Sequence, residues 1–194
     1  MTQTDTAAAT TVTLERSALT GSYTIDPSHS RLGFVARHAM VTKVRGSFGG
    51  FEGSAQLDFD NPADSSASVT IQVASIDTAN GQRDEHLRTN DFFDAPTFPT
   101  ITFTSTGVEA EDEDTVNVVG DLTIKGVSKA VTIAFTYTGA SKDPYGNTRV
   151  GFEGSTVIKR SDWGVTYNAA LETGGVLVSD KITLEFDIAA VRNA

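Results

Sequence analysis

Three histidines, His29, His38 and His86, are the residues of this 194-residue chain with the most versatile chemistry. Three imidazoles can hold zinc at an open catalytic site. The chain lacks the H-E-x-x-H pattern, however, and has no cysteine to supply a thiolate ligand. His29 and His38 have an odd separation, which would place them on opposite faces of one strand. We therefore expect hydrogen-bonded histidines and no metal site. A metal-dependent hydrolase or isomerase that uses the histidines is the alternative.

Motifs for other kinds of catalysis are also missing. The chain has no G-x-S-x-G nucleophile elbow, and the glycine-rich residues 46–50 match neither common phosphate-binding pattern. We expect these glycines to mark a bulge or a close approach of backbone. Asp84, Glu85 and His86 lie between two arginines, which favours a solvated, ion-paired helix face over an acid–base pair. The sequence therefore predicts no catalytic residue and no cofactor.

Arg160 and Trp163 pair a cation with an aromatic side chain in the segment RSDWG. One interpretation is an ion-paired arginine and a packed tryptophan at the end of a strand. The other is a rim that contacts an anionic group. Both interpretations remain open from the residues alone.

Hydrophobic residues alternate with polar ones along most of the chain, as in residues 131–138 and 182–188. Period-two alternation gives each strand one apolar and one wet face, which is typical of antiparallel sheets. Residues 82–88 break the pattern and predict a short helix, followed by a turn at 91–94. Residues 40–45 are expected to form a turn of helix or a loop. About eight strands with one or two short helices must bury their apolar faces in a sandwich or a closed barrel.

The apolar faces of these strands would form either a filled core or the wall of a ligand cavity. A barrel of about eight strands is compatible with both outcomes. An open interior would suit a long hydrocarbon, since each buried CH₂ contributes about 0.8 kcal/mol without any catalytic group. The inward-facing residues expected to line it are Phe34, Phe59, Ile71, Phe103, Leu122, Ile124, Ile133, Phe135, Leu184 and Phe186.

The chain is acidic, with 15 lysines and arginines against 25 aspartates and glutamates and a net charge of −10. This balance argues against a nucleic-acid partner and against docking onto an anionic membrane surface, while it leaves room for a local basic pocket. No apolar stretch reaches the roughly 20 residues of a membrane helix, so we expect no stable membrane insertion. Residues 1–20 predict a disordered Thr/Ala-rich tail without the features of a signal peptide. The expected location is cytoplasmic, or periplasmic or extracellular if an export signal has been removed.

Several motifs in register resemble those of the YceI-like proteins over residues 21–190. They are residues 23–30 (YTIDPSHS), 75–78 (SIDT), 83–88 (RDEHLR), 91–94 (DFFD), 98–103 (FPTITF), 120–127 (GDLTIKGV) and 160–164 (RSDWG). The resemblance implies an all-β, extended antiparallel lipocalin-like β-barrel over residues 21–191. It also implies an elongated apolar cavity for a long polyisoprenoid, no catalytic residues and frequent dimers, so a homodimer is the expected assembly.

We therefore expect a non-enzymatic protein that binds, carries or stores a polyprenyl phosphate or an isoprenoid quinone. A filled barrel that acts through its surface, as a stress or interaction module, is a further alternative. The candidates for contact with a polar head group at the rim are Arg37, His38, Arg45, His86, Arg160 and Trp163.

Overall fold

The strands of the computed structural model form one antiparallel sheet, and the structure describes residues 14–172 and 174–194. The strands are β1 (Gly21–Ile25), β2 (Arg31–His38), β3 (Thr42–Phe48), β4 (Phe51–Leu57), β5 (Ser66–Gln72), β6 (Ile76–Asp77), β7 (Thr100–Ala110), β8 (Thr115–Ile124), β9 (Val127–Lys142), β10 (Thr148–Lys159) and β11 (Lys181–Arg192). One α-helix, α1 (Gly81–Arg88), and four 3-10 segments (Arg16–Leu19, Pro62–Asp64, Val73–Ser75 and Arg160–Trp163) complete the described chain.

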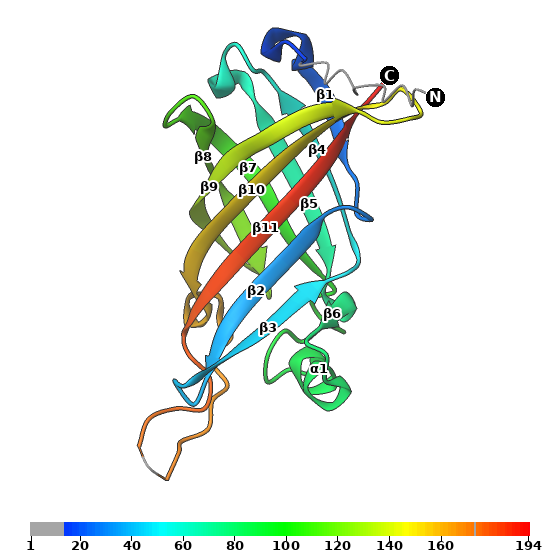
Figure 1. Cartoon of the computed structure of the whole chain (residues 1–194). Helices are drawn as coiled ribbons and strands as arrows, with labels where there is room; N and C mark the ends of the chain where they lie inside the picture. Colours follow the sequence, from blue (N-terminus) through cyan, green and yellow to red (C-terminus); the bar gives the residue numbers. More distant parts are fainter. Residues whose placement is uncertain (1–13, 173) are drawn as a thin grey trace, which may run out of the picture.

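The sheet closes into a barrel, and three of the strands around it are interrupted (Figure 1). β1 and β2 lie end to end along β11, with Ile25 opposite Ala190 and Arg31 opposite Asp187. β4 and β3 continue the next strand in the same way, and β5 and β6 the one after. The three interrupted strands and β7 to β11 make a ring of eight, closed where β1 pairs with β11. The predicted antiparallel barrel is therefore confirmed, and the sandwich is excluded.

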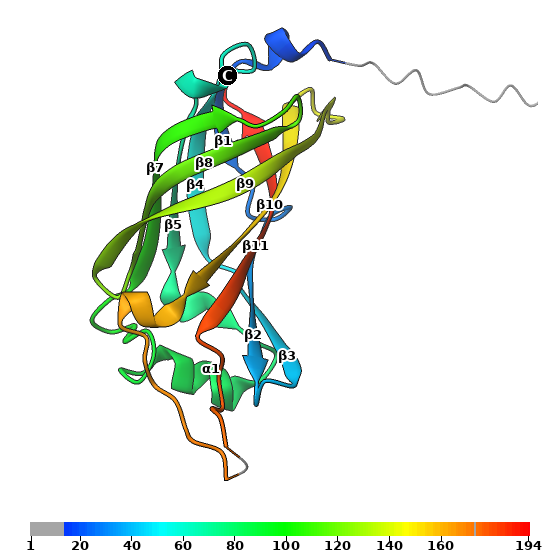
Figure 2. The same cartoon turned by 90° about the vertical axis from the view of Figure 1, so that its left-hand side faces the viewer.

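The two ends of the barrel are built differently (Figures 1 and 2). α1, the β2–β3 hairpin and the segment 165–180 lie at one end, which we call the helical end. The β7–β8 hairpin (residues 111–114) and the segment 58–66 lie at the other, which we call the acidic end. Among the described residues, no helix has the length and apolar character needed to cross a bilayer.

The predicted helix over 82–88 is confirmed as α1, which begins one residue earlier. The Asn80 side chain caps it by accepting a hydrogen bond from the backbone N–H of Arg83 at 3.0 Å. Residues 40 and 41 form a turn, but the prediction for residues 42–45 is wrong, because β3 begins at Thr42. Its outward cations hide the alternation, and pairing with β2 extends both strands almost to the tip.

The disordered tail expected over residues 1–20 falls mostly outside the described part of the chain. Residues 1–13 lie outside the described residues, but Leu19 is buried and its carbonyl accepts a hydrogen bond from the Tyr23 hydroxyl at 2.6 Å. Arg192 at the end of β11 donates to the carbonyls of Ala18 and Thr20. These contacts fix residues 18–20 to the barrel, because they satisfy carbonyls that a mobile tail would leave to water.

Candidate ligand-binding cavity

The barrel encloses a cavity of about 330 Å³ that extends along its interior. Apolar side chains from β1 to β5 and from β7 to β11 form most of its wall. All ten residues predicted from alternation line it: Phe34, Phe59, Ile71, Phe103, Leu122, Ile124, Ile133, Phe135, Leu184 and Phe186. The interior is therefore hollow. The filled-barrel alternative, in contrast, requires side chains to occupy this space.

Three glycines leave space for phenylalanine rings to pack closely against this wall. Gly46 lies opposite Phe34 in the β2–β3 register, and a Cβ at Gly46 would lie 2.4 Å from the Phe34 ring. Gly154 lies opposite Phe135, where the same distance would be 2.5 Å. At Gly120 a Cβ would lie 2.4 Å from the ring of Phe103. The rings thus lie over the backbone of neighbouring strands, in the close approach that only glycine permits. This arrangement leaves room along the barrel axis.

The helical end of the cavity is closed by packed apolar side chains. Phe92, Trp163 and Val165 are buried there, and Leu87 of α1 and Phe93 pack against them. α1 is held in place through Asp84, a buried carboxylate that accepts hydrogen bonds from the backbone N–H and hydroxyl of Thr78 at 2.9 and 2.5 Å. These hydrogen bonds fix α1, and with it Leu87, over this end of the barrel.

The acidic end carries most of the polar lining. Its charged lining residues are Arg16, Asp58, Asp112, Glu113 and Asp114, and the last three are exposed. Arg16 forms an ion pair with Asp114, and its guanidinium lies 4.9 Å from the centre of the Tyr137 ring. The cavity meets solvent at this end.

Sequence reasoning did not assign these residues to the site. Arg16 lies within the expected tail, and a run of acids such as residues 111–114 is typical of a solvated hairpin tip. The sequence does contain a signal for a charged rim. It is the run of four acids at a hairpin between two strands that each have one apolar face.

Four of the six head-group candidates do not line the cavity: Arg37, His38, Arg45 and His86. In the β2–β3 pairing, Phe34 points inward, so Arg37 and Arg45 point outward, and both are exposed. His38 ends β2 and bridges Val178. His86 lies 2.7 Å from Asp91 and packs edge-on against Phe92 and Tyr167. Residue type alone suggests these head-group candidates. The period of two along the strands instead places both arginines on the outer face of the barrel.

Arg160 and Trp163 line the cavity, but their N–H groups donate to backbone carbonyls of the barrel. Arg160 is buried and donates to the carbonyls of Ser179 and Val165 at 3.0 and 2.7 Å. Burial lowers the pKa of this guanidinium. The Trp163 indole N–H donates to the Leu122 carbonyl at 2.9 Å. Trp163 is therefore packed at the end of a strand as the first interpretation expects, whereas Arg160 contacts backbone carbonyls and forms no ion pair among the described residues.

The histidines lie on separate elements: the loop 26–30, the end of β2 and α1. Within the described residues, no group of three His, Cys, Asp or Glu side chains is arranged to hold a metal ion. His29 instead contacts Asp26 through Nδ1 at 2.8 Å.

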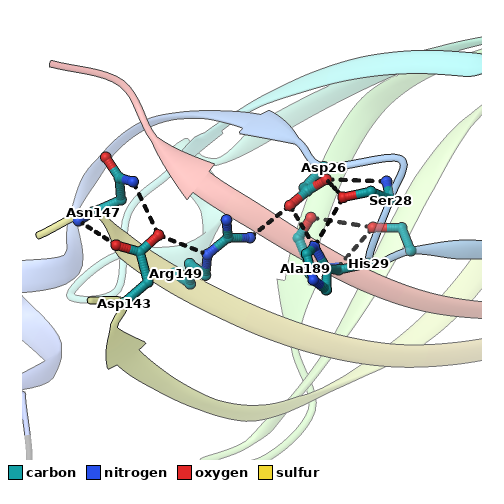
Figure 3. Close-up of polar contacts among 8 residues, drawn as sticks. Asp26, Ser28, His29, Asp143, Asn147, Arg149 and Ala189 are labelled. Atoms are coloured by element: carbon teal, nitrogen blue, oxygen red, sulfur yellow. Dashed lines mark hydrogen bonds and ion pairs between the residues drawn. The ribbon is translucent and has the colours of Figure 1, made fainter. Parts of the chain in front are cut away.

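An ion-paired cluster joins the break between β1 and β2 to the β9–β10 hairpin, outside the cavity (Figure 3). Asp26 accepts hydrogen bonds from Arg149 Nη1 and the Ser28 hydroxyl, both at 2.6 Å. The Arg149 hydrogen bond, followed by those of Ser28 and His29, holds the pKa of the Asp26 carboxyl far below its usual range. Arg149 Nε also donates to Asp143 at 3.1 Å. The cluster secures the barrel where its strand is interrupted.

The chain is similar to known proteins over most of its length. The family model for the YceI-like domain matches residues 23–190. A UPF0312 protein of Ectopseudomonas mendocina is 40% identical over 151 residues, which cover 77% of this chain and 79% of that protein. A UPF0312 protein of Photorhabdus laumondii is 43% identical over 149 residues, which cover 76% of this chain and 77% of that protein.

Solved structures show the same barrel. BcnA of Burkholderia cenocepacia superposes with a TM-score of 0.75 at 28% identity, covering 85% of this chain and 98% of BcnA. The YceI protein of Campylobacter jejuni gives a TM-score of 0.71 at 32% identity, covering 81% and 90% of the two chains. A polyisoprenoid-binding domain from Saccharophagus degradans gives 0.68 at 19% identity, covering 88% and 98%, which shows the fold alone. With a family match that spans nearly the whole barrel, the chain belongs to the YceI-like family.

Proposed function

We propose that this protein binds and carries a long-chain polyisoprenoid lipid, with the tail in the barrel cavity and without catalysing a reaction. The observation that carries the proposal is an elongated apolar cavity, packed shut at the helical end and reaching solvent at the acidic end. β11 alone has 12 residues, so its length is about 40 Å at ~3.3 Å per residue. Such a cavity suits a flexible hydrocarbon, which needs area and shape rather than hydrogen bonds.

A carrier role fits the chemistry of the lining better than an enzyme does. No histidine or cysteine lines the cavity in the described part of the chain, and the carboxylates that do lie at its acidic end. A hydrolase or isomerase needs a base or nucleophile next to the bound substrate. The apolar middle of the cavity supplies neither.

The charges of the lining favour an uncharged head group, so the proposed ligand is an isoprenoid quinone rather than a polyprenyl phosphate. The described lining holds two cations, Arg16 and Arg160, and four acids. Arg16 is paired with Asp114, and Arg160 donates to backbone carbonyls. At the acidic end a phosphate would have to displace the Arg16–Asp114 ion pair beside Asp112 and Glu113, at a cost that a quinone avoids.

Family resemblance supports the ligand class. The sequence motifs imply a polyisoprenoid ligand, and the fold neighbour from Saccharophagus degradans is described as polyisoprenoid-binding. At 19% identity, that neighbour supports only the fold. The proposed head group and carrier role therefore rest on the cavity of this chain.

The test is native mass spectrometry of the purified protein, followed by mass spectrometry of an organic extract. We expect an isoprenoid adduct of about one molecule per chain. Delipidated protein should then take up a long-chain ubiquinone at least tenfold more tightly than undecaprenyl phosphate. Failure to bind a ubiquinone, a polyprenol or the phosphate would overturn the carrier role. Preference for the phosphate would overturn only the choice of head group.

A further inference from the structure

The tip of the β2–β3 hairpin exposes two large apolar side chains. Met40 and Val41 are 56% and 76% exposed, in a chain whose other strand ends carry mostly polar residues. Ala39 and Met40 have positive φ values of 49° and 60°, and the Val41 N–H donates to the His38 carbonyl. The tip is thus a tight turn with a defined backbone, in a conformation that few residues other than glycine and asparagine favour.

The segment 165–180 joins the hairpin and extends its apolar surface. The Ala39 N–H donates to the Leu177 carbonyl at 2.8 Å, and the Ser179 N–H donates to the Arg37 carbonyl at 2.9 Å. Val176, next to Leu177, is 39% exposed. Met40, Val41 and Val176 together are called the apolar tip below.

Three cations lie on the outer face of the same hairpin. Residues 31–51 contain four arginines and lysines and no acid, although acids outnumber bases in the whole chain. Arg37 lies directly opposite Lys43 in the register, and Arg45 follows on the same exposed face. Like charges in opposite positions destabilise a strand pair.

None of these three cations forms an ion pair among the described residues. Two acids lie on the adjoining segment. Asp180 accepts hydrogen bonds from Ser161, and Glu172 is exposed. A third acid, Asp77 of β6, is exposed next to β3. The hairpin presents three cations that form no ion pair among the described residues, beside its apolar tip.

We propose that the β2–β3 hairpin docks the protein reversibly on the surface of an anionic phospholipid bilayer. Arg37, Lys43 and Arg45 would contact lipid phosphates, while the apolar tip enters the interface. Cations beside exposed apolar side chains are the features that bind a bilayer surface without spanning it. The acidic end lies at the opposite end of the barrel, so repulsion from the same lipids fixes the orientation (Figure 2).

The docking surface lies beside a stretch of barrel wall that lacks a backbone ladder. β3 pairs with β6 only at Ser47 and Phe48, so residues 42–46 have a strand partner only in β2 within the described chain. The adjoining wall is made of side chains, including the Phe48 and Phe93 rings, whose centroids lie 6.1 Å apart. A lipid that enters here displaces side chains and breaks no strand pairing. The docked hairpin thus places a part of the cavity wall without a continuous strand ladder next to the bilayer.

The experiment is co-sedimentation with phosphatidylcholine vesicles, with and without one quarter phosphatidylglycerol, and with no isoprenoid present. Binding therefore tests docking independently of the proposed cavity ligand. We expect binding only to the anionic vesicles. Arg37→Gln with Lys43→Gln should weaken it about 25-fold, or about fivefold per charge. Met40→Asn with Val41→Ser should weaken it about tenfold, and asparagine suits the positive φ at position 40.

Matched controls lie elsewhere on the surface. Lys129→Gln with Lys142→Gln removes two exposed charges outside the hairpin, and Tyr145→Ser removes a side chain that is 90% exposed. Both should bind the anionic vesicles as the parent protein does. Equal binding to neutral and anionic vesicles, or no effect of either hairpin variant, would overturn the proposal. So would a fall in solution mass on Met40→Asn with Val41→Ser, because the tip would then join two copies of the chain.

Discussion

The Arg149 guanidinium on β10 lies 2.6 Å from a carboxylate oxygen of Asp26, the first residue after β1. The same guanidinium contacts Asp143 in the β9–β10 hairpin, and the two acids leave it little exposed (Figure 3). The strand shared by β1 and β2 is broken at residues 26–30. The cluster holds the two halves in register along β11, because one backbone hydrogen bond, from the Asp26 N–H to the Ala189 carbonyl at 2.8 Å, lies between the two stretches of strand pairing.

This cluster predicts a specific loss of stability in acid. The Asp26 pKa lies far below its ordinary value of 3.8, first because of Arg149. The pKa of Asp143 is lowered to about 2, first by the Asn147 side chain. Both pKa values are depressed on folding, so their contribution is complete above about pH 4 and is lost as the pH falls toward 2. Urea midpoints measured from pH 6 to pH 2.5 should drop most below pH 4.

Asp26→Asn is the control for this prediction. The variant should be less stable than the parent at pH 6, and its urea midpoint should fall less steeply below pH 4. An equal slope in both proteins would show that other carboxylates cause the acid sensitivity.

The glycines beneath the phenylalanine rings predict a second effect. Gly154→Ala would place a Cβ 2.5 Å from the Phe135 ring and 2.9 Å from the Ala134 carbonyl. The ring must then move into the cavity, which we expect to cost about 1–3 kcal/mol of unfolding free energy. Bound isoprenoid should decrease as well. Gly107→Ala, at a strand position where a Cβ would meet nothing within 4 Å, should change neither quantity. Denaturant titration and extraction of bound lipid check both expectations.

The cavity lining could be predicted from the sequence because alternation is local. In β9, for example, Ile133 and Phe135 face inward while Thr136 is exposed, as the period of two requires. The same rule excludes Arg37 from the cavity, since it lies an odd number of residues from Phe34. That error came from choosing head-group candidates by residue type.

The use of particular donors could not be predicted. Arg160 contacts Ser179 and Val165 through a segment whose path no periodicity fixes. Arg16 reaches the rim because residues 18–20 are tied to Arg192, a contact between opposite ends of the chain. Such long-range pairings depend on the closed barrel rather than on any local pattern.

A third prediction concerns Arg160, which we expect to stabilise the fold rather than to bind the ligand. Arg160→Met should leave buried carbonyls of Val165 and Ser179 without their donor and should destabilise the protein by about 3 kcal/mol. Quinone affinity per folded molecule should stay within twofold of the parent. Arg37→Met, at an exposed position, should change stability by less than about 0.5 kcal/mol. A tenfold loss of affinity in folded Arg160→Met protein would restore this arginine as a head-group contact.

Phe135 and Thr136 are neighbours on β9 that point to opposite sides of the barrel wall, so they offer a matched test of where the tail lies. Phe135→Asp places an unpaired carboxylate in the apolar interior, next to the Phe186 ring at 5.7 Å between centroids in the parent. Ubiquinone binding should fall at least tenfold, because the tail would have to pack against a charge. Thr136→Asp adds the same charge to the outer face and should leave binding unchanged. Circular dichroism verifies that both variants fold.

If Phe135→Asp fails to fold, Phe135→Ala with the same titration replaces it. This variant should alter the preferred chain length of the ligand, because it enlarges the cavity. Unchanged affinity and chain-length preference in a folded Phe135 variant would show that the tail does not lie along this part of the wall.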